Sequence, residues 1–443
     1  MKTILRGLVG LLLALTLLWL LAEGGNLLTA QGFFPWRNLL VQYSGLLGMG
    51  VMSVAMVLAV RPAWLEHRLH GLDKMYRLHK WLGISGLVLS VAHWLFSQGP
   101  KWLVQAGLLE KPARGPRPTP TIEIFRVFQE QRGLAEQIGE IAFYAAVFLI
   151  AIALIKRFPY RYFFITHRWL AVVYLALVVH SVVLTNFSYW TEPVGILMGV
   201  LMLAGTLAAL ISLFRRIGIN RKAVGEIVGV KYLEGVKVNA ITIQLKDRWP
   251  GHEAGQFAFV TFDEREGAHP FTISSASAAD GRLQFLIKAL GDYTRTLADT
   301  LKPGDPVTVE GPYGRFHFEG TSRRQIWIGA GIGVSPFVAR LKTLATQPDG
   351  RVVDFFHSTA EVDEEALQRL EADARAAGVR LHIFISTRDG RLTGDRLRTL
   401  VPDWQQAEVW FCGPSAFGDA LRQDLTSQGL PVAWFHQELF EMR

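Results

Sequence analysis

The hydrophobic residues of this chain are concentrated in its first half. Long apolar runs begin near residues 6, 39, 82, 141, 169 and 193, and none follows residue 222. Runs of this kind are typical of membrane-spanning helices. The pattern predicts six membrane helices within residues 1–222.

The first apolar run, residues 7–22, has two interpretations. It is short and follows a basic N-terminus, as in a cleaved signal peptide. No small-residue cleavage pair follows it, so we favour a retained membrane helix.

Residues 223–320 and 321–443 show two different soluble patterns. The first range alternates in short β-like runs separated by Gly and Pro, which predicts a small antiparallel β-barrel. In the second range, strand-like runs alternate with helix-like runs, which predicts a doubly wound α/β domain. The fold class that we expect is a multi-domain membrane protein with a six-helix bundle, a barrel and an α/β domain.

The net charge of +8 is unevenly distributed along the chain. Residues 1–222 hold 22 Lys and Arg against 9 Asp and Glu, whereas residues 223–443 hold 24 against 29. Basic residues are densest in 1–6, 61–80, 156–168 and 215–222, which places these segments in the cytoplasm by the positive-inside rule. We therefore expect a multi-pass protein of the inner or cell membrane with cytoplasmic soluble domains. No basic, aromatic-interleaved stripe indicates nucleic-acid binding.

Two of the apolar runs carry a histidine at each end. His79 and His93 are fourteen residues apart, and His167 and His180 are thirteen apart. Ionisable side chains within membrane helices are costly and usually functional. A pair on each of two parallel helices gives two levels, roughly 20 Å apart, with one imidazole from each helix at each level. This arrangement suits two haems with bis-imidazole iron. It is favoured over a proton relay, over packing histidines and over zinc, which needs more protein ligands.

The two spacings do not place the histidines on one helix face equally well. At about 100° per residue, His93 lies about 40° from His79, but His180 lies about 140° from His167. We expect either an irregular fifth helix, such as one with a π-bulge, or offset haems.

Two motifs in the soluble half suggest ligand binding. GAGIGVSP, residues 329–336, follows a strand and opens a helix, so its amides can face a diphosphate. Val334 departs from the GxGxxG fingerprint, and a plain tight turn is the alternative. HPFTISS, residues 269–275, brings hydroxyl groups to a strand end that can face a phosphate or flavin, or be an ordinary strand exit.

Five motifs in order give the chain a family resemblance: HPFT, GDYT (291–294), GPYG (311–314), GAGIGVSPF (329–337) and CGP (412–414), behind two His-bearing runs. The chain resembles the NADPH oxidase and ferric reductase superfamily over nearly its whole length. The resemblance implies a six-helix domain with two b-type haems, an FAD-binding barrel and an NAD(P)H-binding domain. It pairs His79 with His167 and His93 with His180.

The resemblance also implies roles for residues of the soluble half. The flavin-contacting residues would be His269, Pro270, Phe271, Thr272 and Ser275, with Gly291 and Thr294 near the FAD diphosphate. The nucleotide-contacting residues would be Gly329, Gly331, Gly333 and Pro336, with Cys412, Gly413 and Pro414 beside the nicotinamide. A buried strand thiol is the alternative for Cys412.

Two further assignments concern the flavin face and the nucleotide. Related enzymes place an aromatic residue over the flavin, and Phe440 offers one, although Met442 could take that place. Arg388 and Arg391 are positioned to meet a 2′-phosphate, which favours NADPH over NADH, with a solvated surface loop as the alternative.

The resulting hypothesis is a membrane oxidoreductase. Electrons would pass from cytosolic NAD(P)H through FAD and two haems to an acceptor outside. Dioxygen, giving superoxide, is the leading acceptor, with ferric chelates next. The alternatives are an electron-supply subunit for a membrane quinone or periplasmic partner protein, and a cytochrome whose soluble half no longer binds nucleotide.

Overall fold

The computed structural model describes residues 2–69, 71–110, 120–155 and 157–438. These residues divide into two compact units between Ile217 and Gly218, a few residues before the boundary expected at 222. Each unit is described by itself.

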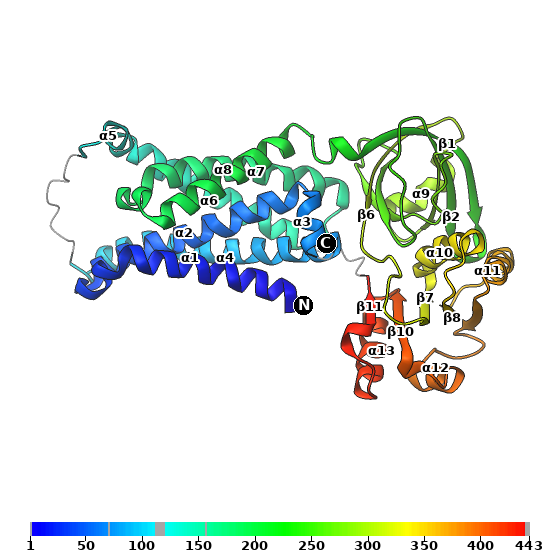
Figure 1. Cartoon of the computed structure of the whole chain (residues 1–443). Coiled ribbons are helices and arrows are strands. Elements are labelled where there is room, and N and C mark those ends of the chain that lie inside the picture. Colours follow the sequence, from blue (N-terminus) through cyan, green and yellow to red (C-terminus); the bar gives the residue numbers. More distant parts are fainter. Residues whose placement is uncertain (1, 70, 111–119, 156, 439–443) are drawn as a thin grey trace. The chain divides into compact units, whose positions relative to one another are not determined.

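The first unit is a bundle of long helices that cover the six predicted apolar runs (Figure 1). In the described residues these helices are α1 (Lys2–Thr29), α2 (Phe33–Ala59), α4 (Leu72–Gln105), α6 (Arg132–Leu154), α7 (Tyr160–Leu184) and α8 (Pro193–Leu213). Two short helices, α3 (Ala63–Arg68) and α5 (Glu123–Glu130), were not predicted. Both are too short to produce a strong periodic pattern.

Five of the long helices are sufficiently long and apolar to cross a membrane: α1, α2, α6, α7 and α8. The His-bearing helix α4 is not among them, because charged and polar side chains such as Lys80 and Gln98 interrupt its apolar sequence. That α4 also crosses the membrane stays a prediction.

Helix α2 is central to the bundle, where it packs against α4 and α8, while α6 packs against α7. Tyr174 on α7 is 3% exposed, and its hydroxyl lies 2.8 Å from the hydroxyl of Ser53 on α2. A Cβ atom on Gly205 of α8 would lie 2.1 Å from the same tyrosine oxygen, so only glycine lets α8 approach this closely. Large apolar side chains such as Leu21, Ile141 and Leu203 face outward, as expected of a bundle surrounded by lipid.

The second unit begins with a six-stranded antiparallel sheet in the order β4-β3-β6-β1-β2-β5. Its strands are β1 (Lys222–Leu233), β2 (Val238–Leu245), β3 (Phe257–Thr261), β4 (His269–Thr272), β5 (Arg282–Lys288) and β6 (Pro306–Tyr313), and α9 (Asp292–Thr300) lies between β5 and β6 in sequence. A bridge between Ile273 and Phe285 joins the two edges. The sheet therefore curls until its edge strands touch at this point.

The remainder of the second unit is a five-stranded parallel sheet in the order β11-β10-β7-β8-β9. The strands are β7 (Arg324–Ala330), β8 (Val352–Thr359), β9 (Arg380–Ile385), β10 (Ala407–Cys412) and β11 (Phe435–Gln437). The helices are α10 (Ser335–Thr346), α11 (Glu364–Ala376), α12 (Gly394–Leu400) and α13 (Ser415–Ser427).

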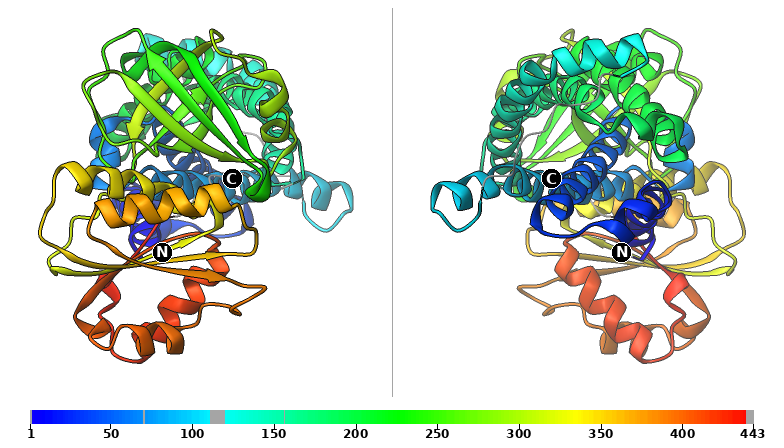
Figure 2. Two further views of the ribbon diagram at one scale, coloured as in Figure 1. Left: turned by 90° about the vertical axis from the view of Figure 1, so that its right-hand side faces the viewer. Right: turned by 90° about the vertical axis from the view of Figure 1, so that its left-hand side faces the viewer.

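The helices cover both faces of this parallel sheet. Figure 2 shows α10 and α11 on one face and α12 and α13 on the other. Phe337 of α10 and Leu370 of α11 belong to one buried cluster, whereas Leu397 of α12 and Leu421 of α13 belong to another. From β7 the chain winds outward through β8 and β9, and then returns to the other side of β7 as β10. This is the doubly wound topology predicted from the sequence.

Candidate functional site

The four predicted histidines form two ring pairs between α4 and α7. The ring centroids of His79 and His167 are 5.8 Å apart, and those of His93 and His180 are 6.2 Å apart. The ring planes cross at 69° and 85°, respectively. The pairing implied by the family resemblance is therefore the pairing found in the structure.

Main-chain carbonyls of neighbouring helices orient three of the rings. The Nδ1 atom of His79 lies 2.9 Å from the carbonyl oxygen of Ala55, and that of His93 lies 3.0 Å from the carbonyl oxygen of Val41. His180 Nδ1 lies 2.8 Å from the carbonyl oxygen of Ala135 on α6. Because a carbonyl only accepts, each Nδ1 atom carries the proton and donates it. Each Nε2 atom is left with a free lone pair, the form in which histidine binds metals.

The geometry of the pairs fits one metal ion between two imidazoles. A metal–imidazole bond is roughly 2 Å long, so two rings on opposite sides of one ion have centroids about 6 Å apart. In the described part of the chain, no group of three or more His, Cys, Asp or Glu side chains could hold a metal ion. Zinc therefore fits poorly, whereas haem iron, whose other four ligands are porphyrin nitrogens, fits well.

The expectation of an irregular fifth helix is wrong. Helix α7 is α-helical without interruption from Tyr160 to Leu184, and both of its histidines still meet their partners on α4. His167 and His180 lie at different angles around the axis of α7. Their side chains nevertheless both reach α4, so the helix itself need not be distorted.

Two glycines make room for the rings of the second pair. A Cβ atom on Gly45 of α2 would lie 3.1 Å from the ring of His93, and one on Gly139 of α6 would lie 1.9 Å from Nδ1 of His180. Sequence reasoning missed both residues, because a single glycine in an apolar helix carries no motif.

In the second unit, the two predicted flavin motifs come together. His269 of β4 stacks on Tyr293 of α9 with ring centroids 4.8 Å apart and an angle of 25°. Burial lowers the pKa of His269 to about 4, so its ring is neutral at physiological pH. Burial, together with Asp263 and Glu266, raises the pKa of Tyr293 to about 12. The motif HPFT therefore presents a neutral aromatic surface beside GDYT, and Tyr293 is a site residue that the sequence analysis did not select.

Two of the predicted hydroxyl groups of the flavin motifs have protein partners, and a third is largely buried. Thr294 Oγ1 accepts from the main-chain N–H groups of Leu290 at 3.1 Å and Gly291 at 3.0 Å, and so caps α9. Ser275 Oγ accepts from the N–H of Gln284 at 3.2 Å, and Thr272 is 9% exposed. These contacts shape the turns, and the proposed contacts of these residues with FAD stay predictions, as do those of Pro270 and Phe271.

The glycine motif and the CGP motif meet between β7 and β10, where the strand order of the parallel sheet reverses. Strands β7 and β10 are neighbours, with Gly329 opposite Cys412. A Cβ atom on Gly333 would lie 2.2 Å from the carbonyl oxygen of Cys412, and one on Gly413 would lie 2.6 Å from Cβ of Ala330. Only glycines allow the two turns to pack this closely. In open α/β sheets, ligands bind at such a topological switch point, outside the carboxyl ends of the strands.

The residues around these turns have different local roles. Gly331 has φ 56°, a left-handed conformation that favours glycine, and Pro336 lies in the first turn of α10. The thiol of Cys412 is fully buried among aromatic side chains, and this burial raises its pKa. The structure therefore presents the main chain of Cys412 to Gly333, and a thiol role beside the nicotinamide stays a prediction. Pro414 precedes α13 as its N-cap residue.

The two remaining predictions lie away from the switch point or outside the described residues. Arg388 follows the edge strand β9, and its guanidinium pairs with Asp389 at 2.9 Å. Arg391 is exposed, two residues after the turn that contains Arg388. Phe440 and its alternative Met442 lie outside the described residues.

Comparisons with known proteins agree with this architecture. Residues 44–178 match the family model of the ferric reductase like transmembrane component, and residues 226–317 match that of an FAD-binding domain. Together the two domains match the NADPH oxidase and ferric reductase superfamily. The chain is accordingly an oxidoreductase with a membrane domain and an FAD-binding module.

The chain spans only part of the length of the curated relatives that it matches. The chain is 27% identical over 210 residues to the ferredoxin reductase component of 3-ketosteroid-9-alpha-monooxygenase from Rhodococcus rhodochrous, which covers 46% of this chain and 60% of that protein. It is 27% identical over 209 residues to an NADPH oxidoreductase from Mycobacterium tuberculosis, with 44% and 54% covered. A solved cytochrome P450 reductase from Amycolatopsis has 22% identity and a TM-score of 0.44, and covers 50% of this chain and 70% of its own.

Proposed function

We propose that the chain transfers electrons from NAD(P)H across the membrane to an acceptor on the opposite side. The imidazole pairs His79–His167 and His93–His180 would each hold one b-type haem. The curled sheet around His269 and Tyr293 would hold FAD, and the turns at Gly333 and Gly413 would hold the nucleotide. When bound, FAD accepts a hydride and releases single electrons, which the two haems carry through the bundle.

The observation that carries this proposal is the geometry of the two ring pairs. Each pair joins the same two helices, has its centroids about 6 Å apart, and includes a ring whose Nδ1 atom donates to a main-chain carbonyl. Two levels of paired imidazoles within one bundle are suited to electron transfer along the helices. Because each haem would be held by two imidazoles of the chain, the acceptor would receive electrons without binding to the metal.

The residues of this chain position the cofactors and tune their surroundings. Carbonyls of Ala55, Val41 and Ala135 hold three imidazoles in the tautomer that binds iron. The neutral ring of His269 places no charge beside the flavin. No general base is required, since the reaction moves electrons and a hydride between cofactors.

For the acceptor, we propose dioxygen, which would be reduced to superoxide. This reaction needs no protein ligand at the iron and no acid catalyst. Ferric chelates, a membrane quinone and a protein partner are the alternative acceptors. The excess of Lys and Arg in the connecting segments 61–80 and 156–168 favours a cytoplasmic position for the FAD and nucleotide domains.

The decisive experiment follows the haem absorption bands after anaerobic addition of NADPH to the purified, FAD-loaded protein. Both haems should become reduced, and admission of air should reoxidise them with formation of superoxide. The variants His93→Ala and His167→Ala should each lose about one haem and block the passage of electrons. The matched control is His382→Gln on β9, where glutamine can keep a hydrogen bond to Asp354. Wild-type protein without haem, or with haem that stays oxidised, would contradict the proposal.

A further inference from the structure

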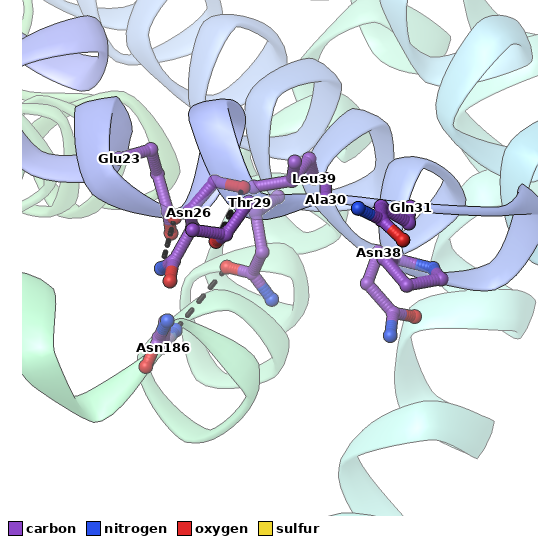
Figure 3. A pocket seen from close by; sticks show the side chains of 10 residues that line it. Glu23, Asn26, Thr29, Ala30, Gln31, Asn38, Leu39 and Asn186 are labelled. Carbon is purple, nitrogen blue, oxygen red and sulfur yellow. Dashed lines mark hydrogen bonds between the residues drawn. The ribbon is translucent and has the colours of Figure 1, made fainter.

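A polar pocket of about 450 Å³ opens at the end of the bundle that holds His93 and His180 (Figure 3). It is formed by the end of α1, the segment that leads into α2, the first turns of α2, and Asn186, two residues after the end of α7. Five of its ten lining residues are carboxamides and one is a carboxylate: Asn26, Gln31, Asn38, Gln42, Asn186 and Glu23. Its size is within the usual range for small-molecule sites.

The lining of the pocket is not suited to two of the acceptors considered above, which would react elsewhere. No Lys, Arg or His is among the described residues that line it. The guanidinium of Arg37, next to the pocket, already donates to Asn38 Oδ1 and to the carbonyls of Phe96 and Ser97, each at 3.0 Å. The lining itself therefore presents no cation to an anionic ferric chelate. Dioxygen needs no hydrogen-bonding groups, and a polar lining gives it no advantage. Carboxamides both donate and accept hydrogen bonds and carry no charge. They suit an uncharged ligand with carbonyl or hydroxyl oxygens.

Helix α2 connects the pocket directly to the second histidine pair. Leu39 and Gln42 line the pocket. The carbonyl of Val41 accepts from His93, and Gly45 lies against the ring of His93. Gln42 and Gly45 are three residues apart, or about 4.5 Å along the helix axis. A ligand in the pocket would lie within a short distance of any haem held by His93.

The pocket also contains a buried acid that the proposed electron transfer does not use. Glu23 on α1 is 2% exposed. Its carboxylate accepts from Asn26 at 2.6 Å and from the hydroxyl of Tyr189 at 2.5 Å, and Trp19 donates to the same hydroxyl at 2.9 Å. A carboxyl group buried in a membrane helix is costly, and its presence indicates a function. Here it can exchange a proton with a ligand in the pocket.

Exposed apolar side chains lie on the segments that form the pocket. Leu28 is 91% exposed, Phe33 45% and Trp36 44%. Aromatic side chains at the ends of membrane helices are typical of the membrane–water interface. A ligand dissolved in the bilayer can therefore reach the pocket from the lipid.

We propose that this pocket binds the headgroup of a lipid-soluble quinone and that the chain also reduces quinone to quinol. The quinone takes up two electrons and two protons, one at each of its carbonyl oxygens. The electrons come from NAD(P)H, which is oxidised to NAD(P)⁺. The Glu23 carboxylate takes up a proton from water at that end of the bundle and passes it to the quinone, and the second proton comes from the same water. The electron supply rests on the proposed function, whereas the binding of quinone does not.

Binding can be tested on the oxidised protein without NADPH. Decylubiquinone is titrated into the detergent-solubilised full chain, and quenching of tryptophan fluorescence gives the dissociation constant. Asn38→Leu should weaken binding about tenfold, because an apolar side chain replaces an exposed hydrogen-bonding group of the pocket. The matched control Gln105→Leu, an exposed amide at the end of α4 outside the pocket, should bind like the wild type. If Asn38→Leu does not fold, Asn186→Leu replaces it.

Turnover separates the role of Glu23 from binding. Under anaerobic conditions with NADPH, Glu23→Gln should bind decylubiquinone within about threefold of the wild type, yet form quinol about tenfold more slowly relative to its rate of haem reduction. Absence of saturable binding by the wild type, or equal affinity in Asn38→Leu and the wild type, would overturn the quinone site. Displacement of the quinone by ferric citrate would also overturn it. If NADPH fails to reduce the haems, the proposed function fails, and the binding titration still decides whether the pocket takes quinone.

Discussion

The ring of His180 lies directly against Gly139, where an added Cβ atom would come within 1.9 Å of the Nδ1 atom of the histidine. The same Nδ1 atom donates to the carbonyl of Ala135, one turn earlier on α6. Helix α6 thus both orients this ring and leaves space for it. Both functions should fail together if the space at Gly139 is filled.

Gly139→Ala should cost the protein one of its two proposed haems. The methyl group would displace His180 from its hydrogen bond and from its partner His93, so the haem content should fall from about two to about one per chain. The ratio of haem to protein in the purified variant measures this. Gly133→Ala on the same helix is the control, since a Cβ atom there meets nothing within 4 Å. A Gly139→Ala protein with unchanged haem content and spectrum would contradict the assigned role.

Gly333→Ala should impair reduction by NAD(P)H and leave the haem sites intact. Its methyl group would lie 2.2 Å from the carbonyl oxygen of Cys412, so the two turns at the switch point must move apart. We expect NADPH to reduce the flavin at least about tenfold more slowly, while dithionite still reduces the haems. Gly229→Ala in β1 is the control, because its nearest contact would be an ordinary one at 3.9 Å. Equal rates in the two variants would exclude a nucleotide site at these turns.

The stack of Tyr293 on His269 should contribute to FAD binding through its ring. Tyr293→Phe keeps the ring and removes the hydroxyl, whereas Tyr293→Ala removes both. An aromatic pair is worth about 0.5–1.5 kcal/mol, so FAD should dissociate about 2- to 12-fold more readily from the alanine variant. The phenylalanine variant should bind like the wild type. Flavin fluorescence on dilution measures the difference, and equal loss in both variants would assign the effect to the hydroxyl instead.

The second unit should lose stability as the pH falls from about 6.5 towards 4. His357 is 7% exposed, and burial lowers its pKa from 6.5 to about 4 in the folded state. Below pH 6.5 the unfolded chain binds a proton that the folded chain does not, which favours unfolding. The full effect is on the order of 3 kcal/mol, and His269, with the same lowered pKa, acts in the same direction. Above pH 6.5 this contribution is constant.

Thermal unfolding followed by flavin fluorescence at pH 7 and pH 5 measures this dependence. His357→Leu should reduce the difference between the two midpoints, because the leucine does not titrate. It should also lower stability at pH 7, since the hydrogen bond between His357 and the carbonyl of Gly329 is lost. A variant with the wild-type pH dependence would show that His357 is not the titrating group.

The periodic parts of the fold were predictable from the sequence, and the contacts between them were not. Apolar runs located the long helices, and the change from alternating to strand–helix pattern located the two sheets. The histidine pairs were predicted because two matching spacings are hard to obtain by chance. The prediction of an irregular α7 was wrong because it compared only the angles at which Cα atoms lie around the helix axis and ignored side-chain rotamers. His167 and His180 reach their partners from a regular helix.

Residues that act through close packing gave no sequence signal. Gly45, Gly139 and Tyr293 became visible only when the helices and strands were assembled. Glu23 is different, because a single acid directly after the apolar run 7–22 is a functional signal in itself, although it was not selected from the sequence. Its partner Tyr189 is 166 residues away and could not have been identified without the structure.

Helix α2 carries the carbonyls that orient both histidines of α4. His79 donates to Ala55 and His93 donates to Val41, so both the donors and the acceptors are fourteen residues apart on two antiparallel helices. One inserted or deleted residue in α2 between Val41 and Ala55 would rotate one carbonyl by about 100° relative to the other. Either His79 or His93 could then keep its hydrogen bond to a carbonyl of α2, but not both. The fourteen-residue interval in α4 is therefore tied to an equal interval in α2, and the length of one helix between its two sites cannot change unless the other changes with it.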